Sequence, residues 1–225
     1  MDFTQFKGII FDLDGTLVNS SHVWSYIDEK FMAKRSIEIP GDYFKKVSSM
    51  NFNQAAQYTI ERFGLNETVD SVTEEWYAMA ENEYAHNVFI KPGADEFLRY
   101  IKSCGIKIAL ATASSEPLYS SVLKNNGVYD LFDFFASTDQ VKRGKGFPDV
   151  YELACSEIAL TPKDCAVFED IIEGIQGAKA GSFTAVACLD KHYAADWEDM
   201  KREADFYFSD YRKLIPKPLS VGTLA

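Results

Sequence analysis

The sequence has few residues of the types that crosslink small secreted proteins or bind zinc. Only four of its 225 residues are cysteines and three are histidines, and no two cysteines form a C-x-x-C pair. Widely spaced cysteines of this kind indicate reduced thiols rather than a disulfide framework or a zinc site. We therefore expect a protein of a reducing compartment, with a cytoplasmic location.

Long apolar runs and an excess of positive charge are also missing. No stretch of about 18 apolar residues could cross a membrane, and the N-terminal segment lacks the apolar core of a secretion signal. The formal net charge of -11 disfavours nucleic acid and anionic membranes as partners. With 47% hydrophobic residues, the chain can bury one large core and a smaller inserted one. An anionic small substrate would need local positive charge, and the oligomeric state stays open.

The most informative stretch joins an apolar run to two acids. Residues 8–13 are rich in Ile and Phe, which is typical of a central strand covered on both faces, and Gly15 ends the run. Asp12 and Asp14 therefore lie at the C-terminal edge of this strand, with both carboxylates on one face unless the chain turns between them. Two adjacent carboxylates repel each other, so the pair is stable at neutral pH with a cation between them or with one proton retained. Alone, the stretch is equally well an acidic turn.

The rest of the chain divides at about residue 92. Residues 21–91 carry apolar side chains at three- and four-residue spacing, beginning with the stripe of Val23, Trp24, Ile27 and Phe31, which predicts an all-helical insertion. Beyond Pro92, helices alternate with strands, which predicts an α/β fold with a Rossmann-like parallel sheet formed by residues 1–20 and 92–225. The expected strands are 106–111, 134–136, 166–168 and 184–188, and the expected helices are 94–104, 116–126, 149–158 and 173–180.

Polar side chains follow several of these strands. Thr112 ends the second strand, a basic loop covers residues 142–145, and Glu169 and Asp170 end the strand at 166–168. Ligands of such sheets bind beyond the carboxyl ends of the strands, so these groups are expected to lie together. Each also has an ordinary interpretation, as a helix start, a solvated loop or an acidic turn.

The string D-x-D-G-T-L-V-x-S at residues 12–20 resembles the first motif of the haloacid dehalogenase-like hydrolase superfamily. Thr112, the stretch G-K-G-F-P-D-V-Y with Lys145, and E-D-x-x-x-G-I from Glu169 resemble the second, third and fourth motifs in the required order. The chain departs from this pattern at Gly146 and Ile171, where many relatives carry Pro and Ser.

The resemblance covers nearly the whole chain. It identifies residues 21–91 as the helical cap of the subgroup that contains beta-phosphoglucomutase and phosphoglycolate-type phosphatases. It implies a Mg²⁺-dependent phosphatase that hydrolyses a small phosphorylated metabolite through an aspartyl-phosphate intermediate. Asp12 would be the nucleophile, Asp14 the general acid and base, and Lys145 the cation that neutralises Asp12 and the phosphoryl group.

The resemblance also implies ligands for the metal and for the phosphate. Metal ligands would be the Asp12 carboxylate, the Asp14 backbone carbonyl and Asp170, with Glu169 either as a further ligand or as a group beyond the ligands. The phosphate would be bound by Lys145, by the Thr112 hydroxyl and by the backbone N–H groups of Gly15, Thr16 and Ala113.

Two alternatives to the phosphatase stay open. A beta-phosphoglucomutase-type mutase shares the four motifs, but its cap carries an Arg that binds a distal phosphate. Residues 45–50 read K-K-V-S-S-M here, so Lys45 and Lys46 are the candidates for that contact and water is the default acceptor. A catalytically silent binding module is the more remote alternative.

Overall fold

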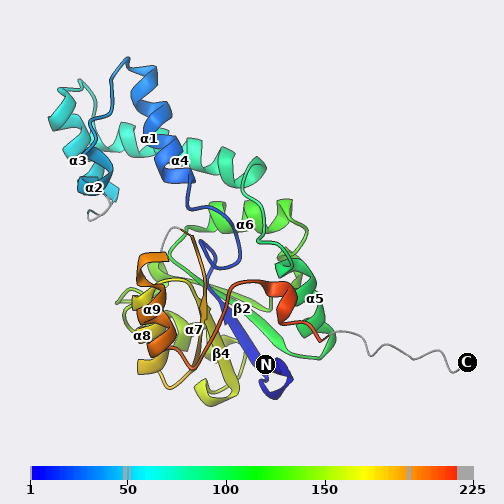
Figure 1. The fold of residues 1–225 in the computed structure, drawn as a ribbon. Helices are drawn as coiled ribbons and strands as arrows, with labels where there is room; N and C mark the ends of the chain where they lie inside the picture. The colour runs from blue at the N-terminus through cyan, green and yellow to red at the C-terminus, as the bar shows by residue number, and fades with distance from the viewer. Residues whose placement is uncertain (1, 48–49, 51, 192–193, 217–225) are drawn as a thin grey trace, which may run out of the picture. The chain divides into compact units, whose positions relative to one another are not determined.

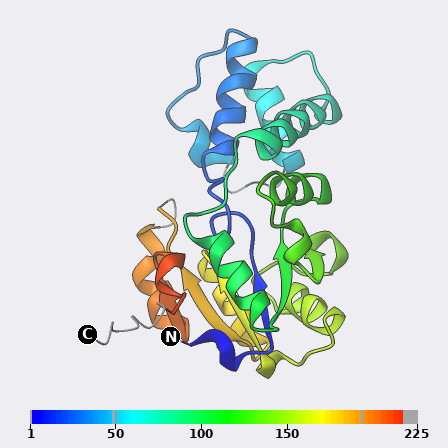
Figure 2. The ribbon, with the colours of Figure 1, turned by 90° about the vertical axis from the view of Figure 1, so that its right-hand side faces the viewer.

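The structure is a computed structural model that describes residues 2–47, 50, 52–191 and 194–216, without the side chain of Lys45. The chain forms two compact units (Figures 1 and 2). The core unit comprises Met1–Asn19 and Phe89–Ala225, and the helical unit comprises Ser20–Val88. That the helical unit acts as a cap stays a prediction. Within the described ranges, no helix combines the length and apolar character that a membrane span requires.

The core unit contains a parallel sheet of six strands in the order β3-β2-β1-β4-β5-β6. All four residues of the central strand β1 are buried, as its apolar sequence predicts. The strands are β1 (Gly8–Phe11), β2 (Lys107–Thr112), β3 (Phe134–Ser137), β4 (Cys165–Glu169), β5 (Thr184–Cys188) and β6 (Phe206–Phe208). The predicted Rossmann-like α/β core is thus confirmed. Since β1 lies between β2 and β4, the carboxyl ends of these three strands are adjacent.

Helices cover both faces of this sheet (Figures 1 and 2). On one face, Ile10 belongs to a buried cluster with Val150 of α7, Ile175 of α8 and Met200 of α9. On the other, the ring of Phe11 packs 6.3 Å from that of Phe97 in α5. Burying a side chain of this size contributes about 1.5–3 kcal/mol. The helices are α5 (Ala94–Ser103), α6 (Glu116–Asn125), α7 (Asp149–Glu157), α8 (Ile172–Ala180) and α9 (Trp197–Glu203).

The helical unit consists of α1 (Val23–Lys34), α2 (Tyr43–Val47), α3 (Phe52–Phe63) and α4 (Val69–His86). The predicted stripe of α1 is buried at Val23, Ile27 and Phe31. Trp24 was expected in the same packing, and its ring does pack within the helical unit, but the side chain is 39% exposed rather than buried. One residue corresponds to about 100° around a helix, so Trp24 lies beside the stripe, with its ring edge-on to that of Phe52.

A polar network lies within the helical unit. The Tyr43 hydroxyl donates to Asp28 Oδ1 at 3.3 Å and lies 2.8 Å from Thr59 Oγ1, which is bonded to the carbonyl of Ala55. Burial raises the pKa of Asp28 to about 6, and the hydrogen bond from Tyr43 only partly opposes this. Folding therefore favours the protonated form of Asp28.

We expect Asp28→Asn to stabilise the protein at pH 7.5 but not at pH 4. The folded protein holds the Asp28 proton up to about pH 6, whereas the unfolded chain releases it near its ordinary pKa. Stability is thus lost as the pH rises from about 4 to about 6, and Asn removes this loss. Thermal unfolding should show a rise in Tm of about 2–4 °C at pH 7.5. An equal change in Tm at both pH values would contradict the assignment.

Candidate active site

Three carboxyl groups meet at the carboxyl ends of β1 and β4. Asp12 follows β1 directly, and its N–H donates to the Phe168 carbonyl at 3.0 Å. Glu169 is the last residue of β4, and Asp170 follows it. One carboxylate oxygen from each acid lies within 4.8 Å of the other two, and the three residues are 0–3% exposed. Parallel pairing of β1 with β4 therefore brings together the acids of the predicted first and fourth motifs.

The loop between β3 and α7 provides the cation of this acidic cluster, which we define as Asp12, Glu169 and Asp170. Lys145 Nζ donates to Asp12 Oδ1 and, at 2.7 Å, to Glu169 Oε1. In the same loop, Arg143 pairs with Asp149 at 2.6 Å, near the surface. Of these two basic residues, only Lys145 faces the acids.

Tyr151 of α7 is a further buried partner, to which the sequence motifs assigned no role. Its hydroxyl donates to Glu169 Oε1 at 2.8 Å. Asp170 Oδ1 accepts from Thr16 Oγ1 at 3.2 Å. Within the described part of the chain, the other oxygens, Glu169 Oε2 and Asp170 Oδ2, are buried without a hydrogen-bond partner. Two acceptors in the cluster thus remain for a ligand.

The electrostatics of the cluster favour a second cation. Burial raises the pKa of Asp12, raises that of Glu169 to about 7, and raises that of Asp170 well above its usual range. Repulsion between the acids adds to this effect, and Lys145 opposes it. Burial would lower the pKa of Lys145, but the carboxylates outweigh it and raise that pKa. An all-oxygen donor set with excess negative charge fits a hard divalent cation such as Mg²⁺.

Asp14 lies outside this cluster because the chain turns after Asp12. The N–H groups of Leu17 and Val18 both donate to the Leu13 carbonyl, at 2.9 and 3.0 Å. The Asp14 carboxylate accepts from Ser114 Oγ at 2.6 Å and is only half-buried. The two aspartates therefore have different partners and different environments.

The loop after β2 supplies Ser114, the hydrogen-bond donor to Asp14. Ser114 N donates to Thr112 Oγ1 at 2.9 Å, and Thr112 is fully buried, whereas Ala113 is exposed. Ser114 was not predicted as a site residue, although it stands directly after the Thr-Ala pair that was. The phosphate-binding roles of Thr112 and Ala113 stay predictions.

Two glycines allow this close packing. Gly15 has a φ of +76°, and a Cβ there would lie 1.9 Å from Asp170 Oδ2. In the first turn of α8, a Cβ on Gly174 would lie 2.4 Å from Glu169 Oε2. The glycine of the predicted fourth motif thus makes room for the carboxylate of Glu169.

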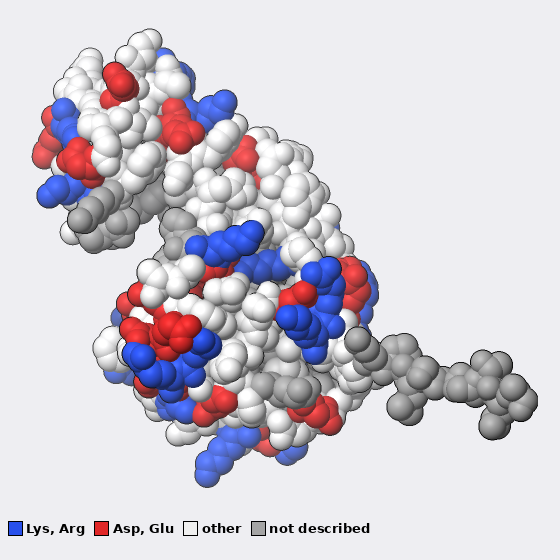
Figure 3. Space-filling view, viewed as in Figure 1, with Lys and Arg blue, Asp and Glu red and all other residues white. Residues whose placement is uncertain are grey.

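The surface charge is mixed. On the face drawn in Figure 3, groups of Lys and Arg lie next to groups of Asp and Glu. The net charge of -11 is therefore not gathered into one acidic patch on this face.

Comparison with known proteins agrees with this geometry. The family model described as haloacid dehalogenase-like hydrolase matches residues 6–181, a range that includes all residues of the acidic cluster. The chain belongs to the haloacid dehalogenase-like hydrolases. Within this family it is an enzyme of the phosphohydrolase type, as its phosphatase relatives indicate.

Two such relatives come from different kingdoms. A bifunctional riboflavin kinase/FMN phosphatase of Arabidopsis thaliana is 29% identical over 80% of this chain, which spans about half (47%) of that protein's length. Hexitol phosphatase A of Escherichia coli is 28% identical over 80% of this chain and 82% of its own.

A solved structure has the same fold. The beta-phosphoglucomutase of Clostridium difficile superposes with a TM-score of 0.71 at 21% identity, over 93% of each chain.

The packing of this haloacid dehalogenase-like site predicts that Gly174→Ala is destabilising. The added Cβ would collide with the buried carboxylate of Glu169, which Lys145 and Tyr151 hold in place. We expect a loss of about 1–3 kcal/mol in the free energy of unfolding, measured with urea. The control is Gly146→Ala, because a Cβ there meets no described atom within 4 Å. Equal stability of the two variants would contradict this packing argument.

Proposed function

We propose that this chain is a Mg²⁺-dependent phosphatase that hydrolyses a small phosphomonoester through an aspartyl-phosphate on Asp12. The observation that carries this proposal is the buried contact of Lys145 Nζ with Asp12 Oδ1, at the carboxyl ends of the strands. A lysine there can neutralise both the nucleophile and the incoming phosphoryl group. Relatives named for FMN and hexitol phosphatase activity support a small phosphorylated substrate.

In the first step, the Asp12 oxygen that Lys145 does not hold attacks phosphorus. The new bond from this oxygen to phosphorus forms as the bond to the leaving oxygen breaks, and Asp14 donates its proton to that oxygen. In the second step, Asp14 accepts a proton from water, which attacks phosphorus and releases inorganic phosphate and the free Asp12 carboxylate. The different partners of Asp12 and Asp14 suit these different roles.

The metal would be held by Asp12, Asp170 and the Asp14 backbone carbonyl, with Glu169 Oε2 as a further candidate. The unpartnered oxygens of Asp170 and Glu169 support this assignment. When bound, Mg²⁺ supplies positive charge that offsets the carboxylates and the phosphoryl oxygens. Lys145, the Thr112 hydroxyl and the N–H groups of Gly15, Thr16 and Ala113 would bind the phosphate.

A sugar-phosphate mutase would use the same core residues and differ in the stretch 45–50. The side chain of Lys45 and residues 48 and 49 lie outside the described residues. Incubation with beta-glucose 1-phosphate, Mg²⁺ and a bisphosphate activator separates the two. Glucose 6-phosphate that accumulates faster than inorganic phosphate would contradict the phosphatase proposal.

The proposed function is tested by phosphate release from sugar phosphates, phosphoglycolate and nucleotides, with Mg²⁺ or with EDTA. We expect Mg²⁺-dependent turnover of at least one ester. The absence of turnover with all of them would favour a silent binding module.

Substitution of the general acid should depend on the leaving group. Asp14→Asn is expected to lower kcat/KM, which reports the first step, by about 10²- to 10⁴-fold for alkyl phosphates, and by less for aryl phosphates, whose leaving oxygens need no proton. Steady-state kinetics with both classes measures this difference. Equal losses for the two classes would count against Asp14 as the proton donor.

Mg²⁺ affinity should depend most on Asp170, the acid that has an unpartnered carboxylate oxygen and no hydrogen bond from a lysine. Asp170→Ala is expected to weaken Mg²⁺ binding more than Glu169→Ala, because Glu169 Oε1 is already bonded to Lys145 and Tyr151. Isothermal titration calorimetry without substrate measures the affinity. Asp199→Ala, on the exposed surface of α9, controls for the lost charge. Unchanged Mg²⁺ affinity in Asp170→Ala would remove this residue from the metal site.

A further inference from the structure

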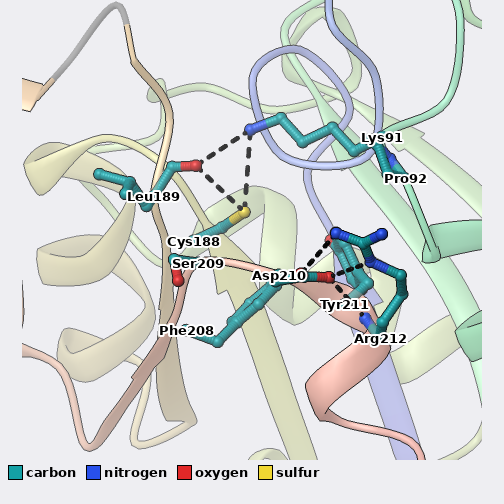
Figure 4. A pocket seen from close by; sticks show the side chains of 9 residues that line it. All are labelled: Lys91, Pro92, Cys188, Leu189, Phe208, Ser209, Asp210, Tyr211 and Arg212. Carbon is teal, nitrogen blue, oxygen red and sulfur yellow. Dashed lines mark hydrogen bonds and ion pairs between the residues drawn. The ribbon is translucent and has the colours of Figure 1, made fainter.

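Lys91 places a second buried cation close to the loop that follows Asp14. Its side chain is only 14% exposed. Nζ donates to the Gly15 carbonyl and, at 3.3 Å, to the Leu189 carbonyl, and it pairs with Asp190 Oδ2 at 2.9 Å. Figure 4 shows the side chain reaching toward Leu189 and Cys188. An ammonium group has three donors, and these three oxygens match them.

The backbone around Lys91 runs beside the same loop. Lys91 N donates to the Leu17 carbonyl at 2.7 Å, and Asn19 N donates to the Phe89 carbonyl at 2.9 Å. Residues 89–91 and 17–19 are therefore joined by main-chain bonds, and Lys91 adds a side-chain bond at Gly15.

The bond to Gly15 fixes the orientation of one peptide group. Every described peptide bond is trans, so the C=O of Gly15 and the N–H of Thr16 point in opposite directions. Holding the carbonyl toward Lys91 directs the Thr16 N–H away from it. Two further hydrogen bonds fix Thr16. Its Oγ1 donates to Asp170 Oδ1, and its carbonyl accepts from the Tyr211 hydroxyl at 3.2 Å.

We propose that Lys91 is a positioning residue for phosphate binding, which aims the Thr16 N–H at the phosphoryl oxygens through its bond to the Gly15 carbonyl. This inference rests on the proposed function, in which that N–H binds phosphate. Lys91 itself touches neither the substrate nor the acidic cluster in this account. Its ammonium acts on the main chain of the loop.

A simpler role for Lys91 is to neutralise Asp190, which is 5% exposed. The two roles are separable because Asp190→Asn removes the ion pair and keeps the bonds to the Gly15 and Leu189 carbonyls. The double substitution Lys91→Met with Asp190→Asn removes these bonds as well, without leaving a buried carboxylate beside an apolar side chain. Lys91→Arg is the conservative variant, which keeps the charge and the donors, and the Lys91 side chain borders a cavity of about 120 Å³.

The test compares the wild type, Asp190→Asn, the double variant and Lys91→Arg. Calorimetry measures the Kd of inorganic phosphate in the presence of Mg²⁺, and separately the Kd of Mg²⁺, while thermal unfolding reports the fold. We expect the double variant to bind phosphate about 10- to 100-fold more weakly than Asp190→Asn, the effect of losing one hydrogen bond to a charged ligand. Mg²⁺ affinity should not fall, because the Lys91 charge that acts on Asp170 opposes cation binding rather than favouring it. Lys91→Arg should recover most of the phosphate affinity.

Equal phosphate affinity in the double variant and in Asp190→Asn would overturn the proposal, whether or not both variants bind phosphate more weakly than the wild type. A parallel loss of Mg²⁺ affinity would also overturn it, because it would indicate a general disturbance of the site. A failure of the proposed function would be seen differently, because the wild type would then release no phosphate from any ester. The test of Lys91 measures the binding of phosphate and does not require turnover.

Discussion

The site depends most on the contact of Lys145 with Asp12 and Glu169. Three carboxyl groups within 4.8 Å of one another, each at most 3% exposed, would repel strongly without it. Removing a charge from water costs several kcal/mol per ion, so such a cluster persists only where the surrounding fold holds its partners. The apolar faces of the sheet supply that stability, and the loop before α7 carries the ammonium to the acids.

The cluster also explains why two aspartates two residues apart can do different chemistry. Asp12 is buried, which raises its pKa, and it is bonded to Lys145, whose charge opposes that rise and favours the ionised carboxylate. Asp14 is half-buried, accepts from a serine hydroxyl and is not one of the three acids of the cluster. A turn of a few residues, held by bonds to the Leu13 carbonyl, produces this difference.

Much of the fold followed from local sequence. The apolar strands, the alternation with helices and the change at Pro92 were sufficient to predict the parallel sheet. The strand β6 was not predicted, because Phe206–Phe208 is too short to show a pattern, and α9 before it has little apolar periodicity. The exposure of Trp24 was missed since composition alone does not show which side of a helix is covered.

The candidate site was predictable only where a motif names the residue. Asp12, Lys145, Glu169 and Asp170 were selected in this way, and the structure brings them together. Tyr151, Ser114 and Lys91 form tertiary hydrogen bonds to residues 18, 100 and 76 positions away, which no local pattern shows.

The measurement that tests the account most directly is acid-quench trapping of the phosphoenzyme during turnover of an aryl phosphate with Mg²⁺, followed by peptide mapping. The account predicts a phosphorylated peptide modified at Asp12, and none in Asp12→Asn; a covalent phosphoenzyme in Asp12→Asn, or phosphate on another residue, would contradict it.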